Sequence, residues 1–386
     1  MAAWDLAWGE FLHFHGDPIA TLAPHVDADE SFVMGSVFIA AYSVLGGMSL
    51  DAPHVRAAID RAGDVAATDA ELGHLRALEL MVAGDFTEAA GAWDRVARAS
   101  RDFAAVRIAH DLYLHVGDDV GRLESSGRAV AEWTPDIAGA HFVMGQYAFA
   151  LEEAGRYAEA ERVGRDALDI DPDDLWARHA LAHVYESTDD QAAALDLLES
   201  SLVRWSAQDA LAVHIWWHLA LRYLAADDPG RALEVVDRIV PDATSAFRLC
   251  DVTSLLWRLE LSGTAVGNRW DVVADRWSAT AERHACAFLD THAVMAFARR
   301  PDHPGATVWF DGVERAGAAG ASENDEIFRD VVGPLVDALR RFGRGDRRGA
   351  ADRIDALGDH RLRRIGGSIA QRDIITLTRH SAGDLP

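Results

Sequence analysis

The chain has 386 residues, of which 37 are basic and 62 are acidic, and its formal net charge of −25 argues against binding to nucleic acid or to an anionic membrane. Every basic residue is an arginine, so chemistry that depends on a Schiff-base lysine or a P-loop lysine is excluded. No apolar run approaches the roughly 18 residues that span a bilayer, and the acidic N-terminus does not resemble a secretory signal. The two cysteines, Cys250 and Cys286, are too few for a disulfide framework, and we expect both to be buried in a cytoplasmic protein.

The clearest repeat lies at residues 139–172, which read as two amphipathic helices around a turn at Gly155. Glycine closes such a turn because it adopts positive φ at little cost. Ala160 and Ala167 place small side chains where the two helices touch, and Pro172 ends the unit. The next unit follows 34 residues later, which is the spacing of tetratricopeptide repeats.

Similar helical pairs cover most of the chain. We predict clear repeats over 70–240, degenerate pairs at 30–62 and 245–357, and a capping segment at 360–386. No stretch alternates like a strand, and no Pro/Ser-rich linker divides the chain. The prediction is therefore an all-α, tetratricopeptide-like α-solenoid, a single domain over 1–386, whose helical hairpins form a right-handed superhelix with a concave groove or pocket.

Several segments resemble the tetratricopeptide repeat protein 38 family, among them HLRALELMVAGDF (74–86), AVHIWWHLALRYL (212–224) and IGGSIAQRD (365–373). The resemblance spans nearly the whole chain. It implies an all-helical repeat fold and no particular activity. The tail after Arg372 departs from the family because it is less apolar than the expected closing helix.

The repeat register places several histidines on the groove. In tetratricopeptide folds, positions 2, 5, 9, 12 and 13 of each first helix form one stripe that lines the groove. His179, His183 and Glu186 share this stripe, and His214 faces it from the next repeat. Histidine exchanges protons near neutral pH, and a neighbouring carboxylate orients it. The predicted catalytic residues are His179, His183, Glu186, His214, Asp290 and His292.

Other side chains are predicted to hold the ligand. They are His74, Arg107, His110, Asp111, His141, Trp216, Trp217, Asp251, Arg258, Gln371 and Arg372. The two tryptophans offer an apolar wall, and the acidic lining favours a neutral or cationic small molecule. Each histidine alone also fits a plain packing role. For Gln371, a capping box with Ser368 is the simpler interpretation.

The histidine spacing also raises the question of a metal. His179/His183 and His214/His218 have the i, i+4 spacing of zinc ligands. However, His218 falls at a repeat position that faces a neighbouring helix, and the HExxH pattern is absent. We therefore expect neither a metal nor another cofactor.

Two functions remain open. The first is binding of a small organic ligand in the His/Asp/Glu/Trp pocket, with cofactor-independent acid–base chemistry such as hydrolysis, elimination or isomerisation. The alternative is an interaction scaffold that holds a peptide or partner protein without catalysis. Redox and nucleotide-dependent chemistry are disfavoured because their motifs are missing. The sequence leaves open whether the chain forms a homo-oligomer.

Overall fold

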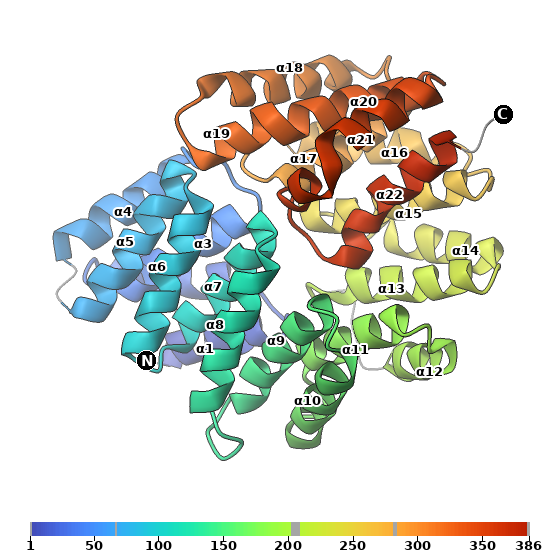
Figure 1. Cartoon of the computed structure of the whole chain (residues 1–386). Coiled ribbons are helices and arrows are strands. Elements are labelled where there is room, and N and C mark those ends of the chain that lie inside the picture. Colours follow the sequence, from blue (N-terminus) through green and yellow to red (C-terminus); the bar gives the residue numbers. More distant parts are fainter. Residues whose placement is uncertain (1, 66–67, 202–208, 281–283, 384–386) are drawn as a thin grey trace. The chain divides into compact units, whose positions relative to one another are not determined.

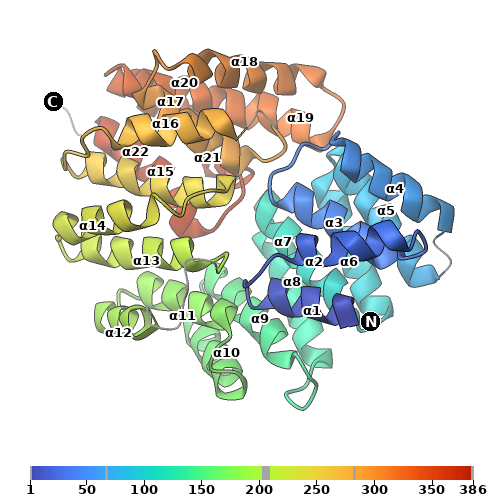
Figure 2. The same ribbon diagram turned by 180° about the vertical axis from the view of Figure 1, so that it is seen from behind.

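The computed structural model describes residues 2–65, 68–201, 209–280 and 284–383, and every regular element within these ranges is helical. The chain divides into two compact units, the first formed by 1–114 with 118–215 and the second by 115–117 with 216–386. Within each unit, consecutive helices pack as hairpins (Figures 1 and 2). This confirms the predicted all-α, tetratricopeptide-like class. Residues 202–208 of the predicted repeat region 70–240 lie outside the described residues.

The first twelve helices begin in the first unit. They are α1 (Ala2–Leu12), α2 (Pro18–Ala28), α3 (Val33–Leu45), α4 (Pro53–Val65), α5 (Asp69–Ala83), α6 (Phe86–Ala99), α7 (Phe103–Val116), α8 (Asp119–Glu132), α9 (Ala140–Glu153), α10 (Tyr157–Ile170), α11 (Leu175–Ser187) and α12 (Gln191–Ser201). Helix α13 (Ala212–Ala225) begins in the first unit and ends in the second.

The second unit contains the remaining helices. They are α14 (Pro229–Ile239), α15 (Ala246–Leu261), α16 (Arg269–Ala279), α17 (Ala287–Arg299), α18 (Pro304–Ala319), α19 (Glu323–Ile327), the π-helical turn η1 (Phe328–Val332), α20 (Gly333–Gly343), α21 (Arg347–Arg363) and α22 (Ile369–Gly383). None of the described helices is both long and apolar enough to cross a bilayer.

The turn predicted at Gly155 is confirmed. Gly155 has φ of 74°, in the left-handed region that glycine enters easily, and Gly84 and Gly117 have φ of 85° and 70° at the turns of two earlier repeats. In the next two repeats the same place is taken by Asp189 and Asp227, with φ of 55° and 57°. Aspartate is among the few other residues that tolerate this conformation.

Small residues let the helices of the best repeat approach closely. Helix α10 buries Ala160, Val163, Gly164 and Ala167, a stripe with the i, i+3, i+4, i+7 spacing of one helix face. The close-contact roles predicted for Ala160 and Ala167 are supported, because neither has exposed surface.

In the region of the first predicted pair, 30–62, the structure has α3 and α4. It also has two earlier helices, α1 and α2, that the sequence pattern did not predict. Helix α1 packs through aromatic rings, with the Phe38 ring centroid 5.0 Å from that of Trp8 and 5.4 Å from that of Phe11. Downstream, helices α15 to α21 lie in the region 245–357 and continue to 363, and α22 lies within 360–386.

Candidate binding sites

Three of the predicted catalytic histidines come together in the first unit. His179 and His183 lie one turn apart on α11, and His214 lies in the first turn of α13. The Nε2 atom of His179 is 3.1 Å from Nε2 of His183 and 3.0 Å from Nε2 of His214. His179 and His183 are 3% and 1% exposed, and His214 is half-buried. These three residues are called the histidine cluster below.

Buried carboxyl groups from α9 lie beside the cluster. Glu152 Oε2 is 3.6 Å from Nδ1 of His183, and the Ser187 hydroxyl donates to Glu152 Oε1 at 2.6 Å. Burial raises the pKa of Glu152 to about 8, and the adjacent charge of Glu153 adds to the increase. The charge of Glu186, another predicted catalytic residue, also raises the Glu152 pKa.

On α7, the predicted ligand-binding residues are held by contacts within the unit. Arg107 donates from Nε to Asp111 Oδ2 at 2.9 Å, and its guanidinium lies 4.7 Å from the Trp176 ring centroid. Burial raises the pKa of Asp111, although Arg107 opposes the change. His110 Nδ1 is 3.2 Å from the Ser126 hydroxyl oxygen. Burial and the charges of neighbouring arginines hold the His110 pKa well below its ordinary value.

The loop between α1 and α2 covers part of this region. The Phe14 ring stacks on Trp176, with centroids 5.7 Å apart and planes 15° apart. Its carbonyl accepts a hydrogen bond from the Ala210 amide. The next residue, His15, places Nδ1 2.6 Å from Asp209 Oδ1. Trp176 is consequently only 6% exposed.

Two further predicted ligand-binding histidines connect helix ends. His74 Nδ1 accepts from the Trp93 indole N–H at 3.0 Å, so its Nε2–H donates to Asp102 at 3.0 Å. His141 Nδ1 lies 2.8 Å from Asp174. The Asp174 carboxylate also accepts from the third amide of α11 and thereby caps that helix.

The remaining predicted catalytic residues, Asp290 and His292, belong to the second unit. Asp290 Oδ1 is 2.6 Å from His284 Nδ1, and burial raises the Asp290 pKa. His292 donates from Nδ1 to the Phe288 carbonyl one turn earlier, at 2.8 Å. Burial lowers the His292 pKa to about 4.

The predicted ligand-binding residues of the second unit also make internal contacts. Arg258 donates to the Ala370 carbonyl at 2.7 Å, and its guanidinium lies 5.5 Å from the Trp217 ring centroid. The Trp216 ring lies 4.3 Å from the Arg238 guanidinium, Asp251 is 6% exposed, and Arg372 donates to the Gly367 carbonyl.

The capping box predicted at the start of α22 is confirmed. The Ser368 amide donates to Gln371 Oε1 at 2.9 Å, and the Gln371 amide donates to the Ser368 hydroxyl at 3.2 Å. The expectation for the cysteines is also confirmed, because Cys250 and Cys286 are both buried and free. Burial raises the thiol pKa of both, to about 12 for Cys286.

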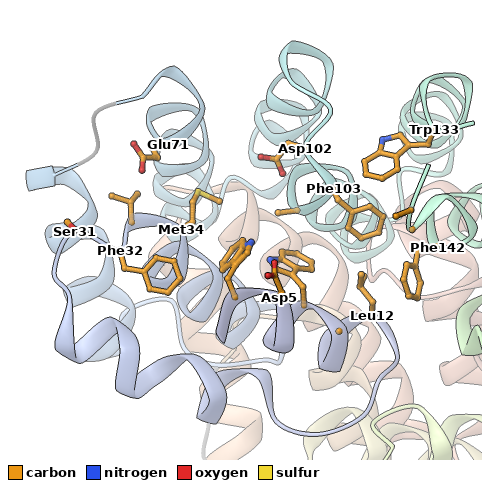
Figure 3. A pocket seen from close by; sticks show the side chains of 17 residues that line it. Asp5, Leu12, Ser31, Phe32, Met34, Glu71, Asp102, Phe103, Trp133 and Phe142 are labelled. Carbon is orange, nitrogen blue, oxygen red and sulfur yellow. The ribbon is translucent and has the colours of Figure 1, made fainter. Parts of the chain in front are cut away.

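A pocket of about 720 Å³ lies elsewhere in the first unit, between α1 and the N-terminal ends of α3, α5, α7 and α9 (Figure 3). In Figure 3, α1 forms one side of this pocket, while Glu71 and Asp102 lie on the other. Aromatic and acidic side chains dominate the lining: Trp4, Trp8, Phe32, Phe103, Trp133, Phe142, Asp5, Glu71 and Asp102. The described lining contains no arginine, no histidine and none of the predicted site residues. We call it the aromatic pocket.

A comparison with known proteins agrees with this fold. Residues 151–204 match a family model described as tetratricopeptide repeat. The chain therefore has an all-α, tetratricopeptide-like fold. A solved structure titled "Crystal structure of APC/C hetero-tetramer Cut9-Hcn1" is similar, with a TM-score of 0.40 and 12% identity. The match covers 89% of the present chain and 62% of the chain in that structure. The present chain therefore spans less than two thirds of that chain's length.

The residues that line the aromatic pocket are missed by the sequence analysis of this tetratricopeptide-type chain. Repeat register locates side chains on first helices from residue 70 onward, and Glu71, Phe103 and Phe142 do lie on such helices. Much of the remaining lining comes from α1 and from residues 31–34, which precede the clear repeats. One signal was available. Trp4 and Trp8 are four residues apart, so a helix over these residues places both rings on one face.

Proposed function

We propose that this tetratricopeptide-type protein is a binding protein whose first unit takes an organic cation into the aromatic pocket. The observation that carries the proposal is the lining, in which half-buried rings such as Trp4, Trp8 and Phe103 lie beside three carboxylates. The face of an aromatic ring attracts a cation, and the attraction strengthens when water is displaced. A pocket with this lining therefore favours a positively charged ligand.

The carboxylates keep negative charge in the pocket. Burial alone would raise the pKa of Asp102, but the hydrogen bond from His74 and those from the Ala105 and Ala104 amides outweigh it, and the pKa is lowered. Asp102 and Glu71 sit at the starts of α7 and α5, where a helix contributes about +0.5 charge. The full negative charge of each carboxylate is larger than this partial positive charge. Asp5 adds a third negative charge from an exposed position.

Binding is favoured over acid–base catalysis at this pocket. Its described titratable lining groups are carboxylates, and no histidine supplies a second group that exchanges protons near neutral pH. Small-molecule binding and partner binding, both considered from the sequence, differ here only in where the cation comes from. A free amine would make the protein a small-molecule binder, whereas a lysine, methylated lysine or arginine side chain would make it the scaffold for a partner peptide.

A set of three probes of the same shape tests the charge preference. Choline, 3,3-dimethylbutan-1-ol and 3,3-dimethylbutanoate are cationic, neutral and anionic, and each carries a similar branched head. By isothermal titration calorimetry we expect choline to bind about 5- to 30-fold more tightly than the neutral alcohol, and the anion to bind most weakly. A trimethyllysine peptide, compared with the same peptide carrying norleucine, tests whether the cation comes from a partner chain.

Two variants with the same change in charge locate the binding. Asp5→Asn removes a carboxylate from the pocket, whereas Asp27→Asn removes an exposed one on α2 that does not line it. We expect weaker choline or peptide binding only for Asp5→Asn. Equal affinity for choline and the alcohol, tighter binding of the anion, or equal effects of the two variants would contradict the proposal.

We also propose two properties that the sequence suggests and that are independent of the ligand chemistry. One is membership of the tetratricopeptide repeat protein 38 family, which the conspicuous segments at 212–224 and 365–373 support. The other is a cytoplasmic location, which the use of two unpaired cysteines supports. Cell fractionation tests the location.

A further inference from the structure

In the histidine cluster, one ring nitrogen of each of the three histidines lies close to the others. Nε2 of His179 is within 3.1 Å of Nε2 of both His183 and His214, and the three residues offer ring nitrogens that all lie within 4.8 Å of one another. The rings come from two helices and from positions 35 residues apart. This convergence lies away from the aromatic pocket, and the inference drawn from it does not depend on the function proposed above.

Hydrogen bonding between the rings accounts poorly for this arrangement. A ring nitrogen carries either one proton or one in-plane lone pair, so it makes one well-directed hydrogen bond. His179 Nε2 has two nitrogen neighbours at hydrogen-bond distance, at 3.1 and 3.0 Å. A single cation would instead accept a lone pair from each of the three rings.

The spacing is close to that of a tetrahedral metal site. Zinc binds histidine nitrogen at about 2.0–2.1 Å, so two such ligands at the tetrahedral angle are ~3.3 Å apart. The observed separations of 3.1 and 3.0 Å are a few tenths of an ångström shorter. Small rotations of the rings would therefore open the cluster to the required size.

The surroundings of His183 also fit a metal ligand. Metal-binding histidines usually turn their second nitrogen toward a carboxylate or carbonyl, which orients the ring. Glu152 Oε2 is 3.6 Å from the second nitrogen of His183, and Ser187 holds the other oxygen of that carboxyl group. Glu152 is only 1% exposed, so its position is set by packing.

We propose that His179, His183 and His214 bind one transition-metal ion, with Zn²⁺ as the best fit. Imidazole suits zinc, copper and nickel, and three protein ligands with an open fourth position are typical of catalytic zinc sites. The site revises the expectation that the chain binds no metal. His218 follows His214 by one turn of α13, and i, i+4 residues share a helix face, so it is included among the variants.

Zinc content is the first measurement. The full-length protein is purified without a histidine tag, stripped with a chelator, equilibrated with Zn²⁺ alone, separated from free metal and analysed for zinc. We expect about one equivalent to be retained. Loading with Co²⁺ in place of Zn²⁺ should give the intense visible absorption of a tetrahedral site, which weakly bound surface cobalt does not show.

Matched variants assign the ligands. His179→Gln and His214→Gln should each lose the bound equivalent, whereas His110→Gln should retain it, because His110 is equally buried in the same unit but lies outside the cluster. Far-UV circular dichroism checks folding, and the half-buried His214 keeps the test usable if His179→Gln does not fold. Loss of metal in His218→Gln would support four ligands, and retention would support three.

Two results would overturn the proposal. One is a wild-type protein that retains no zinc above a buffer blank. The other is a set of cluster variants that retain as much zinc as His110→Gln, which would assign the metal to other groups. Choline binding measured on the same stripped and loaded samples reports separately on the aromatic pocket.

Discussion

Arg122 of α8 has no exposed side-chain surface, and its guanidinium donates to Glu153 at 3.4 Å and lies 4.8 Å from the Phe149 ring centroid. The Glu153 side chain is fully buried as well. Removing Arg122 leaves the Glu153 carboxylate buried without a counter-charge, which destabilises the folded state. We therefore expect Arg122→Met to lower the free energy of unfolding by roughly 3 kcal/mol. Urea denaturation at neutral pH measures the change.

The matched control is Arg162→Met on α10. Arg162 pairs with Asp166 at 2.8 Å, but both side chains are largely exposed. Water screens such a pair, and its removal should cost at most about 1 kcal/mol. Similar losses in the two variants would show that the Arg122 contacts contribute no more than a surface ion pair.

His292 of α17 makes the stability of the protein depend on pH. It is 2% exposed, and burial lowers its pKa from 6.5 to about 4. The unfolded chain takes up a proton near pH 6.5 that the folded chain accepts only near pH 4. Stability is therefore lost as the pH falls through this window, by roughly 3 kcal/mol for this one ring.

Replacement of His292 by asparagine removes that titration. Between pH 7 and pH 4.5, His292→Asn should lose about 2 kcal/mol less unfolding free energy than the wild-type protein. His360→Asn, which changes an exposed histidine of the same unit, should follow the wild-type curve. If all three proteins lose the same free energy, His292 does not hold a lowered pKa in the folded state.

The contacts of a residue could be predicted from the sequence only where its neighbours belong to the same repeat pattern. Helical spacing and the repeat offset together place His179, His183 and His214 near one another, and in the structure their rings lie close together. The contact of Arg107 with an aromatic ring from the N-terminal loop could not be foreseen. Its neighbour Phe14 comes from a loop some 90 residues earlier, and no repeat rule relates the two segments.

At the scale of helices, the contact between α9 and α11 depends on a glycine. A Cβ atom added to Gly145 would lie 3.1 Å from the backbone nitrogen of Ala177. Backbone atoms cannot move aside as a flexible side chain can. We therefore expect Gly145→Ala to lower the free energy of unfolding by about 1–3 kcal/mol, as overpacking in cores usually does.

A glycine-to-alanine substitution on α6 should instead stabilise the protein. A Cβ atom on Gly91 would meet only the Arg95 side chain, at 3.6 Å. Alanine is intrinsically the better helix former, so Gly91→Ala should raise the free energy of unfolding by up to about 1 kcal/mol. Thermal unfolding of both variants beside the wild type measures the contrast, and destabilisation by both would refute the packing argument.

The elements themselves were largely predictable where repeats recur. Glycines at turns, such as Gly84 and Gly155, and small residues at helix contacts, such as Ala160 and Ala167, predict helical hairpins from local sequence alone. Helices α1 and α2 precede the repeat series, and their aromatic packing has no period to recognise. The aromatic pocket was missed for the same reason, because α1 and residues 31–34, which form much of its lining, precede the clear repeats.

At the scale of the whole chain, the net charge of −25 should destabilise the compact state through repulsion among its carboxylates. The unfolded chain spreads the same charges over a larger volume, so repulsion acts mainly on the folded form. Salt screens it, with a Debye length of about 10 Å at 0.1 M. We therefore expect the thermal midpoint to rise between 10 and about 150 mM NaCl.

The shape of the salt dependence separates this cause from its alternatives. Screening saturates once the Debye length falls below the spacing of surface charges, so the midpoint should level off above a few hundred millimolar salt. A steady rise into the molar range would instead indicate exclusion of salt from apolar surface. A midpoint that falls with salt would mean that ion pairs such as Arg269–Asp237, at 2.6 Å, outweigh the repulsion. Scanning calorimetry over this salt series measures the midpoint and distinguishes the three outcomes.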